Sequence, residues 1–200
     1  MTLTEERPAT PNAEARRAMI DSQLRTSGVN EPWVLAAVNA VAREDFVPEQ
    51  ARAAAYIDRA IPLGNGRYLA APLVHARMLT EAAPQATDSV LLVGDGTGYL
   101  AALLRPLCAS LEAVDPATAA TAKGKDSYSL IVIDGAIEQL PASLGARLAE
   151  GGKLVTGLVE RGVTRLATGT MAAGRVVLLP LAEIGIPVLP EFAAPKRWSF

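Results

Sequence analysis

The run Gly94-Asp95-Gly96-Thr97-Gly98 places glycines and small polar residues directly after an apolar segment. Glycines let the backbone turn sharply and approach a ligand closely beyond the carboxyl end of a strand. The G-x-G-x-G spacing differs from the G-x-G-x-x-G fingerprint of dinucleotide sites, and the chain has no G-x-x-x-x-G-K phosphate loop. The run therefore predicts a turn that binds another kind of ligand, or one that only shapes the fold.

Asp115 follows the next apolar segment and brings a carboxylate to the same edge of a predicted parallel sheet. A carboxylate there can accept hydrogen bonds from both ribose hydroxyls of a nucleoside, and each charge-assisted bond contributes roughly 1.5–3 kcal/mol. The glycine turn and this aspartate together predict a nucleoside-type ligand. The alternative is that both are ordinary loop features.

The composition limits the classes of function open to the chain. Half of its 200 residues are hydrophobic and a fifth are charged, which is typical of a globular protein. A net charge of −2 and scattered basic residues argue against nucleic-acid binding. The single cysteine, Cys108, and the single histidine, His75, exclude an internal disulfide and a metal site built from these types. A polar start without a signal peptide, and no apolar run near the ~20 residues of a membrane span, predict a cytoplasmic protein without membrane attachment.

Hydrophobic periodicity predicts a helical first part followed by alternating strands and helices. Apolar runs predict buried strands of a parallel sheet at 89–93 and 129–133. Further strands are expected at 110–114 and 153–159, with a terminal hairpin at 163–168 and 175–181. Helices are expected at 13–26, from Pro32 onward, and at 49–55, 73–83, 99–107 and 141–150, with a loop at 58–72. The order predicts a doubly wound α/β sheet in a single domain, with a helical N-terminal portion (1–88) and an α/β core (89–200).

The segment VLLVGDGTGYLAA (90–102) resembles the S-adenosylmethionine motif of protein-L-isoaspartate O-methyltransferases, which commonly reads VLEIGTGSGYxAA. Other segments match this family in the same order: FVPE (46–49), AYIDRAIPLGNG (55–66), AAPLVHARM (70–78), LIVIDGAIEQLP (130–141) and LAEGGKLVTGLVERGVTRL (148–166). The resemblance covers most of the chain from about residue 13. It implies a class I, Rossmann-like methyltransferase fold with a mostly parallel sheet and a helical N-terminal extension.

The resemblance also implies a cofactor and residue roles. The family uses S-adenosylmethionine to methylate the carboxylate of an isoaspartyl residue in a protein or peptide. The implied cofactor site consists of Gly94, Asp95, Gly96, Thr97, Gly98, Tyr99, Asp115 and Asp134. The implied substrate loop consists of Arg67, Tyr68, Leu69, Ala70 and Pro72. No metal is implied.

Two residues depart from the family pattern. The family's loop usually reads G-x-T-I-S-x-P, and its serine is Ala70 here, which offers no side-chain hydrogen bond. Methyl transfer to a carboxylate needs no general base, so this change affects positioning and the choice of acceptor more than methylation itself. The acidic residue that usually opens the glycine motif is Leu92, and Asp95 is a candidate replacement.

The interval after Asp115 is also short. Residues 116–129 can supply one crossover, which needs roughly 10–12 residues, but not a further strand and helix. We therefore expect the outer strand of the sheet to be lost, together with its adenine contacts. The new edge at 110–115 is then covered by 116–128 or by a second copy of the chain, so a homodimer is one prediction.

Several residues have competing interpretations. For His75, packing near the pocket is favoured over catalysis, and for Tyr99, core packing and contact with the cofactor are equally favoured. Arg67 and Tyr68 are candidates for contacting a carboxylate, although a solvated arginine is more common in a loop. The leading hypothesis is a diverged carboxyl methyltransferase. The alternatives are a catalytically degenerate protein that binds a partner through 58–72, and a structural dimer formed at the sheet edge.

Overall fold

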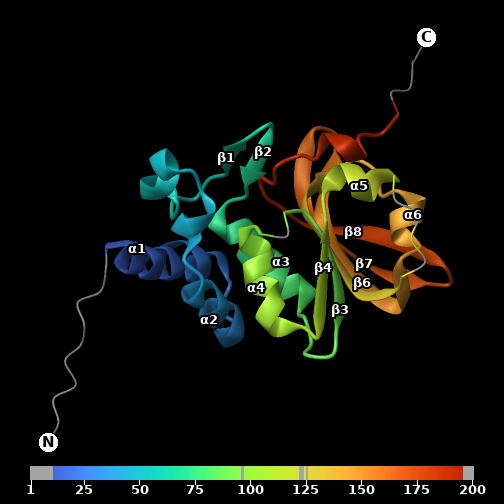
Figure 1. The fold of residues 1–200 in the computed structure, drawn as a ribbon, viewed down its shortest axis with the longest axis horizontal. Coiled ribbons are helices and arrows are strands. Elements are labelled where there is room, and N and C mark those ends of the chain that lie inside the picture. Colours follow the sequence, from blue (N-terminus) through green and yellow to red (C-terminus); the bar gives the residue numbers. More distant parts are fainter. Residues whose placement is uncertain (1–10, 96, 122–123, 125, 196–200) are drawn as a thin grey trace, which may run out of the picture.

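At the centre of the described chain lies a six-stranded sheet with the order β4-β3-β5-β6-β7-β8 (Figure 1). The computed structural model describes residues 11–95, 97–121, 124 and 126–195. The strands are β3 (Ser89–Val93), β4 (Ser110–Val114), β5 (Tyr128–Ile137), β6 (Leu148–Glu160), β7 (Val163–Ala172) and β8 (Arg175–Glu183). Strands β4, β3, β5 and β6 are parallel, whereas β7 is antiparallel to both β6 and β8. The mostly parallel sheet and the terminal hairpin are confirmed.

Strand β3 shows why the central strands are apolar throughout. The side chains of Val90 and Leu92 pack into the core on one face of the sheet, and those of Leu91 and Val93 pack into the core on the other. All four are fully buried. A strand covered on both faces has no solvated side, so its sequence is a continuous apolar run.

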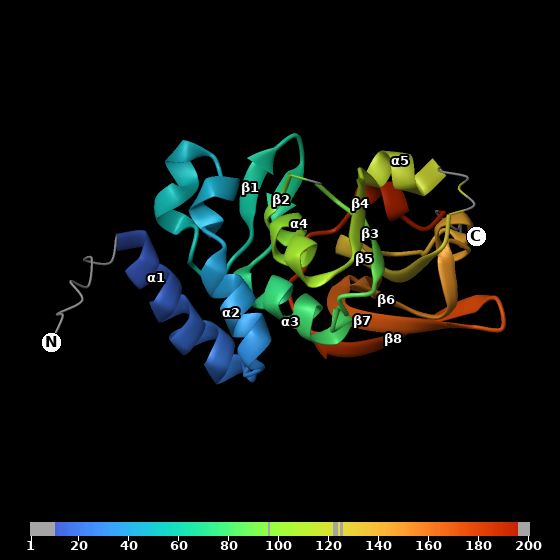
Figure 2. The same ribbon diagram turned by 60° about the horizontal axis from the view of Figure 1, so that its bottom comes forward.

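Helices cover the two faces of the sheet unequally (Figure 2). On one face lie α1 (Pro11–Met19), α2 (Pro32–Ala40), α3 (Pro72–Ala82) and α4 (Tyr99–Leu104). On the other lie the shorter α5 (Pro116–Thr121) and α6 (Ala142–Gly145), with a 3₁₀ turn at Pro190–Phe192. Helix α1 continues through a π-helical turn and a 3₁₀ turn to Ser27, which agrees with the helix expected at 13–26. Within the described residues no helix has the length and apolarity needed to cross a membrane.

The helix predicted at 141–150 is wrong beyond its first turn. Helix α6 ends at Gly145, and β6 begins at Leu148, which pairs with Tyr128 of β5. The chain passes through Gly151 with a φ of +75°, a conformation that suits glycine and continues no helix. Strand pairing with β5 therefore outweighs the helical propensity of this segment.

The segment 58–72, expected to be a loop, contains a hairpin of β1 (Ile61–Gly64) and β2 (Arg67–Leu69). Its turn is Asn65-Gly66, with φ angles of +50° and +73°. Asn-Gly is the sequence that two-residue hairpin turns favour, because both central residues must adopt positive φ. The hairpin matters for function because it forms one wall of the main cavity.

The loss of the outer strand is confirmed for the part of the chain that the structure describes. Helix α5 supplies the crossover from β4 to β5, and β4 is the edge of the sheet. Glu112 of β4 accepts a hydrogen bond from the Tyr128 hydroxyl, which also accepts one of 2.9 Å from Arg147. These contacts join the edge strand to β5 and to the turn that precedes β6.

Candidate functional site

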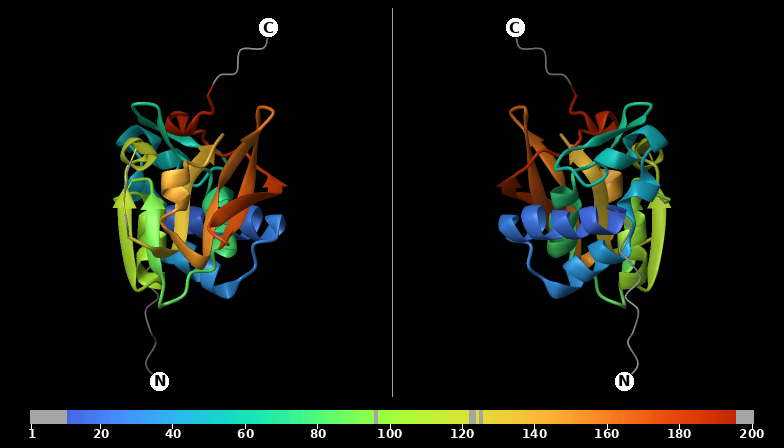
Figure 3. Two further views of the ribbon diagram at one scale, coloured as in Figure 1. Left: turned by 90° about the vertical axis from the view of Figure 1, so that its right-hand side faces the viewer. Right: turned by 90° about the vertical axis from the view of Figure 1, so that its left-hand side faces the viewer.

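A cavity of about 650 Å³ lies at the carboxyl ends of β3, β4 and β5. The β1–β2 hairpin approaches the segment 187–191, hereafter the C-terminal segment, on this side of the molecule (Figure 3). The hairpin, the loop after β3, the start of α5 and the C-terminal segment all contribute to the lining, which comprises Asp45, Phe46, 63–69, Gly94, Asp95, 97–99, Ala113, Asp115, Pro116, Asp134 and 187–189. In open α/β sheets this edge is where ligands bind.

The glycine loop needs its glycines because other atoms approach closely. A Cβ on Gly98 would lie 3.0 Å from the carbonyl oxygen of Asp95, and a Cβ on Gly94 would lie 3.1 Å from the Cβ of Asp134. The Asp95 carboxylate accepts 2.8 Å hydrogen bonds from both the backbone N–H and the hydroxyl of Thr97. The Asp95 side chain thus stabilises the turn itself. Gly96 lies outside the described residues.

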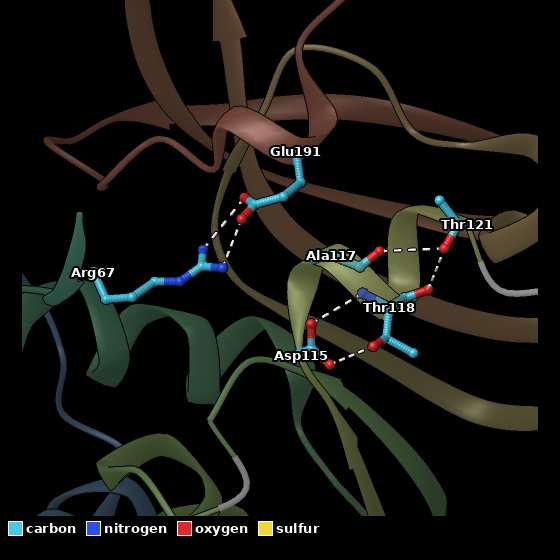
Figure 4. A network of polar contacts seen from close by, with 6 residues as sticks. All are labelled: Arg67, Asp115, Ala117, Thr118, Thr121 and Glu191. Atoms are coloured by element: carbon cyan, nitrogen blue, oxygen red, sulfur yellow. Dashed lines mark hydrogen bonds and ion pairs between the residues drawn. The ribbon is translucent and has the colours of Figure 1, made fainter. Parts of the chain in front are cut away.

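Asp115 lies between the end of β4 at Val114 and the start of α5 at Pro116 (Figure 4). Its Oδ1 accepts a 3.0 Å hydrogen bond from the backbone N–H of Thr118, and its Oδ2 accepts one from the Thr118 hydroxyl. These bonds from Thr118 hold the pKa of Asp115 below its usual value, so the carboxylate remains ionised. Each carboxylate oxygen has two lone pairs and can accept a further bond from a ligand.

Asp134 is directed into the cavity by a bulge in β5. Val132 pairs with Val155 and Ala136 with Gly157, so residues 133–135 of β5 face the single residue Thr156 of β6. Bulges of this kind redirect a side chain and are common beside functional sites. Oδ1 of Asp134 lies 3.0 Å from Nε2 of His75, which is fully buried on α3.

Arg43 determines which nitrogen of His75 carries the proton. Nη1 of Arg43 lies 3.2 Å from Nδ1 of His75, and a guanidinium can only donate. Nδ1 is therefore the acceptor, and Nε2 carries the proton that is donated to Asp134. Arg43, His75 and Asp134 thus form a chain of polar contacts from the protein interior to the cavity, with a neutral imidazole at its centre.

Arg43 is fully buried, and burial lowers its pKa to about 10. It remains charged at neutral pH because its donors and its charge have partners. Nε donates 2.8 Å to the carbonyl of Ala55, and Nη2 donates to the carbonyl of Ala70. The guanidinium lies 5.0 Å from the centre of the Tyr99 ring, where a cation–π contact adds stability.

Arg67 and Glu191 connect the hairpin to the C-terminal segment (Figure 4). Nη2 of Arg67 lies 2.6 Å from Oε1 of Glu191, and Nη1 lies 3.3 Å from Oε2, so the pair is bidentate. Burial alone would raise the pKa of Glu191, but the hydrogen bonds and charge of Arg67, together with a backbone hydrogen bond, outweigh it and leave the pKa below its usual value. Both partners therefore carry charge at neutral pH.

Comparison with known proteins assigns this arrangement to a family. The family described as protein-L-isoaspartate(D-aspartate) O-methyltransferase (PCMT) matches residues 14–114. A protein-L-isoaspartate O-methyltransferase of Koribacter versatilis (strain Ellin345) is 33% identical over 186 residues, which cover 80% of this chain and 84% of that protein. The protein-L-isoaspartate O-methyltransferase 2 of Anaeromyxobacter sp. (strain Fw109-5) is 32% identical over 74% of this chain and 70% of its own.

The chain belongs to the protein-L-isoaspartate O-methyltransferase family. The fold agrees with this assignment. A putative protein-L-isoaspartate O-methyltransferase of Plasmodium falciparum, solved in complex with S-adenosyl-L-homocysteine, has a TM-score of 0.73. It covers 88% of this chain and 98% of its own at 17% sequence identity, so the likeness is one of fold.

Within this family member the predicted substrate loop divides into two parts. Arg67, Tyr68 and Leu69 line the cavity, and Tyr68 is half exposed. Ala70, at the position of the family serine, is 2% exposed and contributes its carbonyl oxygen to Arg43. Pro72 begins α3 behind the cavity wall. The residues that follow Leu69 therefore support the loop from the inside.

Leu92 and Tyr99 are both buried. Leu92 occupies the family's acidic position but is completely buried in the core beside α4, where a leucine packs without needing a partner. Tyr99 is 2% exposed, contacts the ring of Phe46 edge-on and still borders the cavity. Its burial raises its pKa to about 12.

Sequence reasoning missed Arg43 and the C-terminal segment 187–191, which includes Glu191. The segment pairs with the end of β5, where Ala136 N–H donates 2.7 Å to the carbonyl of Pro187 and Leu189 N–H donates 2.8 Å to that of Ala136. The sequence FVPE after Arg43 matched the family, but nothing local marked this arginine as buried. Among the described residues no group of three or more His, Cys, Asp or Glu is placed to hold a metal.

Proposed function

We propose that this chain is an S-adenosylmethionine-dependent methyltransferase that methylates the carboxylate of an isoaspartyl residue in a protein or peptide. Membership of the family supports the activity and the protein or peptide acceptor. The observation that carries the proposal for this chain is the cavity itself. It joins the glycine loop and Asp115, which suit the cofactor, to the β1–β2 hairpin, which suits the acceptor.

The residues around the cavity fit the proposed cofactor in shape. The volume of about 650 Å³ lies within the roughly 300–1,000 Å³ typical of small-molecule sites. At Gly94 and Gly98 a Cβ would lie 3.1 Å from the Asp134 Cβ and 3.0 Å from the Asp95 carbonyl oxygen, respectively, so glycine allows the loop to keep this tight shape beside the cavity. Asp115 offers both carboxylate oxygens at the edge where a ribose is expected.

The charged residues that line the cavity also fit the proposed cofactor. Among the described residues that line the cavity, Asp45, Asp95, Asp115 and Asp134 are carboxylates, and Arg67 is the one cation. When bound, S-adenosylmethionine supplies an electrophilic methyl group on a positively charged sulfur. An acidic cavity favours such a cation over the neutral thioether product. Asp134, held by the neutral His75, adds a fixed negative charge to this environment.

A carboxylate acceptor requires orientation and removal of water more than proton transfer, because its oxygen is already anionic. The hairpin and the C-terminal segment provide two walls that can exclude water. The absence of a hydroxyl at Ala70 is compatible with this chemistry, since no proton has to be accepted there. We propose that 1–200 acts as a single domain in this reaction.

Binding and turnover test the proposal separately. Calorimetric titration with S-adenosylhomocysteine should give micromolar binding that Asp115→Ala weakens by at least tenfold. Methyl incorporation into a synthetic isoaspartyl peptide should occur, whereas the same peptide with ordinary aspartate should remain unmodified. Binding of S-adenosylhomocysteine without methylation of any peptide would favour the alternative of a degenerate member that only binds a partner.

Assembly and location follow as secondary proposals. Strand β4 is an edge of the sheet, so one side of it presents backbone N–H and C=O groups that no neighbouring strand pairs. Pairing with a second copy of the chain is the simplest way to satisfy these groups. Size-exclusion chromatography that gives a monomer at high concentration would exclude this dimer. The acidic net charge supports a protein partner over a nucleic acid, and a cytoplasmic location is part of the same proposal.

A further inference from the structure

Arg67 stands apart electrostatically from the other described residues that line the cavity. It is their only cation, and its neighbours in the lining include four carboxylates. An acceptor carboxylate that enters this cavity meets repulsion from those groups. A guanidinium is the side chain that best offsets it, because its planar donors bind a carboxylate bidentately.

The position of Arg67 suits contact with the acceptor. It lies on β2 of the hairpin, three residues before Ala70, whose side chain offers no hydrogen bond. Ala70 is buried behind the wall, whereas the Arg67 side chain is 37% exposed at the cavity. A ligand in the cavity can therefore reach Arg67 directly.

Glu191 already shows the kind of group that Arg67 binds. Its carboxylate receives two hydrogen bonds from the guanidinium, in the arrangement that an acceptor carboxylate would adopt. The two side chains are 37% and 21% exposed, and ion pairs accessible to water are weak enough to exchange. The backbone around Glu191 is held by the bonds from Glu138 and Gln139 to the carbonyl of Phe192. Exchange therefore requires only rotation of the Glu191 side chain.

We propose that Arg67 binds the carboxylate that is methylated, and that Glu191 occupies the guanidinium until the acceptor displaces it. The inference rests on the proposed function and adds the residue that recognises the acceptor. Glu191 keeps Arg67 extended across the cavity and neutralised in the absence of the acceptor. Glu191 also competes with the acceptor carboxylate for the guanidinium. This competition lowers the apparent affinity of the protein for peptides that carry little negative charge.

The test compares Arg67→Gln with Arg165→Gln. Arg165, on β7, is a matched control because it is similarly exposed and pairs with Glu160 of β6 and Glu183 of β8, away from the cavity lining. Arg67→Gln should raise the KM for an isoaspartyl peptide about tenfold, the loss expected for one charge-assisted contact, with a smaller change in kcat. The Kd of S-adenosylhomocysteine should stay within twofold of wild type. Arg165→Gln should change none of these values.

Glu191→Gln should change the KM for the peptide in the opposite direction. It removes the competing charge and should lower the KM for the peptide about threefold, as expected for release of a partly exposed ion pair. Glu183→Gln, which alters an exposed pair on the far edge of the sheet, should leave KM unchanged. A KM that Arg67→Gln leaves within twofold of wild type would overturn the inference.

Peptide binding in the presence of S-adenosylhomocysteine separates this inference from the proposed function. If wild type binds the peptide but transfers no methyl group, the proposed function fails, and the effect of Arg67→Gln on the peptide Kd still decides the inference. If methyl transfer occurs and Arg67→Gln changes neither KM nor peptide Kd, only the inference fails. If wild type neither binds nor methylates the peptide, both are wrong.

Discussion

Nε2 of His75 donates to Oδ1 of Asp134 across 3.0 Å, and the donor-only guanidinium of Arg43 on the opposite side of the ring keeps this imidazole neutral. The histidine therefore joins a buried positive charge to a carboxylate that lines the cavity. Removing any one of the three leaves a buried polar group without its partner. The cost of such a loss exceeds the net contribution of an ordinary hydrogen bond.

Replacement of His75 by leucine tests this chain of contacts. His75→Leu retains an apolar side chain of similar size but leaves Nη1 of Arg43 without an acceptor and Asp134 without a donor. We expect a loss of about 3 kcal/mol in the free energy of unfolding, measured by urea denaturation. His75→Gln, which retains one acceptor and one donor, should lose less than half as much. Equal losses for the two variants would mean that packing, and not hydrogen bonding, sets the requirement for histidine.

Alkaline pH should destabilise the protein through its tyrosines, of which Tyr99 and Tyr128 have the most strongly raised pKa values. Burial raises the pKa values of Tyr99 and Tyr128 to about 12, and Glu112 contributes at Tyr128, whereas burial lowers that of Arg43 to about 10. Between pH 10 and 12 the folded state keeps two phenolic protons that the unfolded chain loses, and it loses one guanidinium proton that the unfolded chain keeps. The folded state thus binds more protons overall, so stability falls as pH rises through this range.

The Tyr128→Phe variant isolates one contribution to this pH dependence. Removing one of the phenolic protons that the folded state retains should make the decline in unfolding free energy between pH 10 and 12 shallower. Stability at pH 7 should be lower than in wild type, because the hydroxyl bonds Arg147 and Glu112. Denaturant titrations at several pH values give both quantities. An unchanged slope in Tyr128→Phe would contradict the raised pKa.

Gly98 should be intolerant of a side chain although the glycine loop is exposed. A Cβ there would lie 3.0 Å from the backbone oxygen of Asp95, so Gly98→Ala must shift the loop. We expect the affinity for S-adenosylhomocysteine to fall about tenfold, equivalent to ~1.4 kcal/mol. Gly185→Ala is the control, since nothing lies within 4 Å of a Cβ at Gly185. Calorimetry that gives equal affinities for the two variants would show that the loop tolerates the change.

The sheet could be predicted well because the residues within each strand already indicate a strand, without reference to distant parts of the chain. β3 begins and ends where the apolar run 89–93 does, since burial on both faces excludes polar residues from its interior. β4 also has the predicted bounds 110–114, although it is the partly exposed edge strand and carries Glu112. The end of the 141–150 prediction failed because pairing of Leu148 with Tyr128 is a contact between distant residues that local propensity does not contain. The β1–β2 hairpin was predictable from Asn65-Gly66, although the segment was interpreted as a loop.

The part of the site that directly follows the predicted strands could also be predicted. The glycine loop and Asp115 follow strands directly, so strand position alone brings them to one edge of the sheet. Glu191 lies 124 residues from Arg67, and no periodicity connects them. Arg43 stands in a charged sequence, Arg-Glu-Asp, that resembles a solvated surface, yet it is fully buried.

The C-terminal segment should depend on the packing of Leu189 against Gly135 in the β5 bulge. A Cβ on Gly135 would lie 2.5 Å from Cγ of Leu189, so Gly135→Ala forces this leucine away from its position. We expect a loss of about 2 kcal/mol in stability and a weaker Arg67–Glu191 contact, because Leu189 and Glu191 belong to the same short segment. Leu189→Ala alone should lose about 2–3 kcal/mol by leaving a cavity.

The double variant decides whether the two residues act through one contact. With alanine at both positions, the small Leu189 replacement leaves room for the new Cβ, so the combined loss should be smaller than the sum of the two single losses by at least 1 kcal/mol. Urea denaturation of the four proteins provides the cycle. Strictly additive losses would mean that the C-terminal segment is held by its backbone bonds to Ala136 alone. In that case the wall that carries Glu191 would be positioned independently of the bulge that carries Asp134.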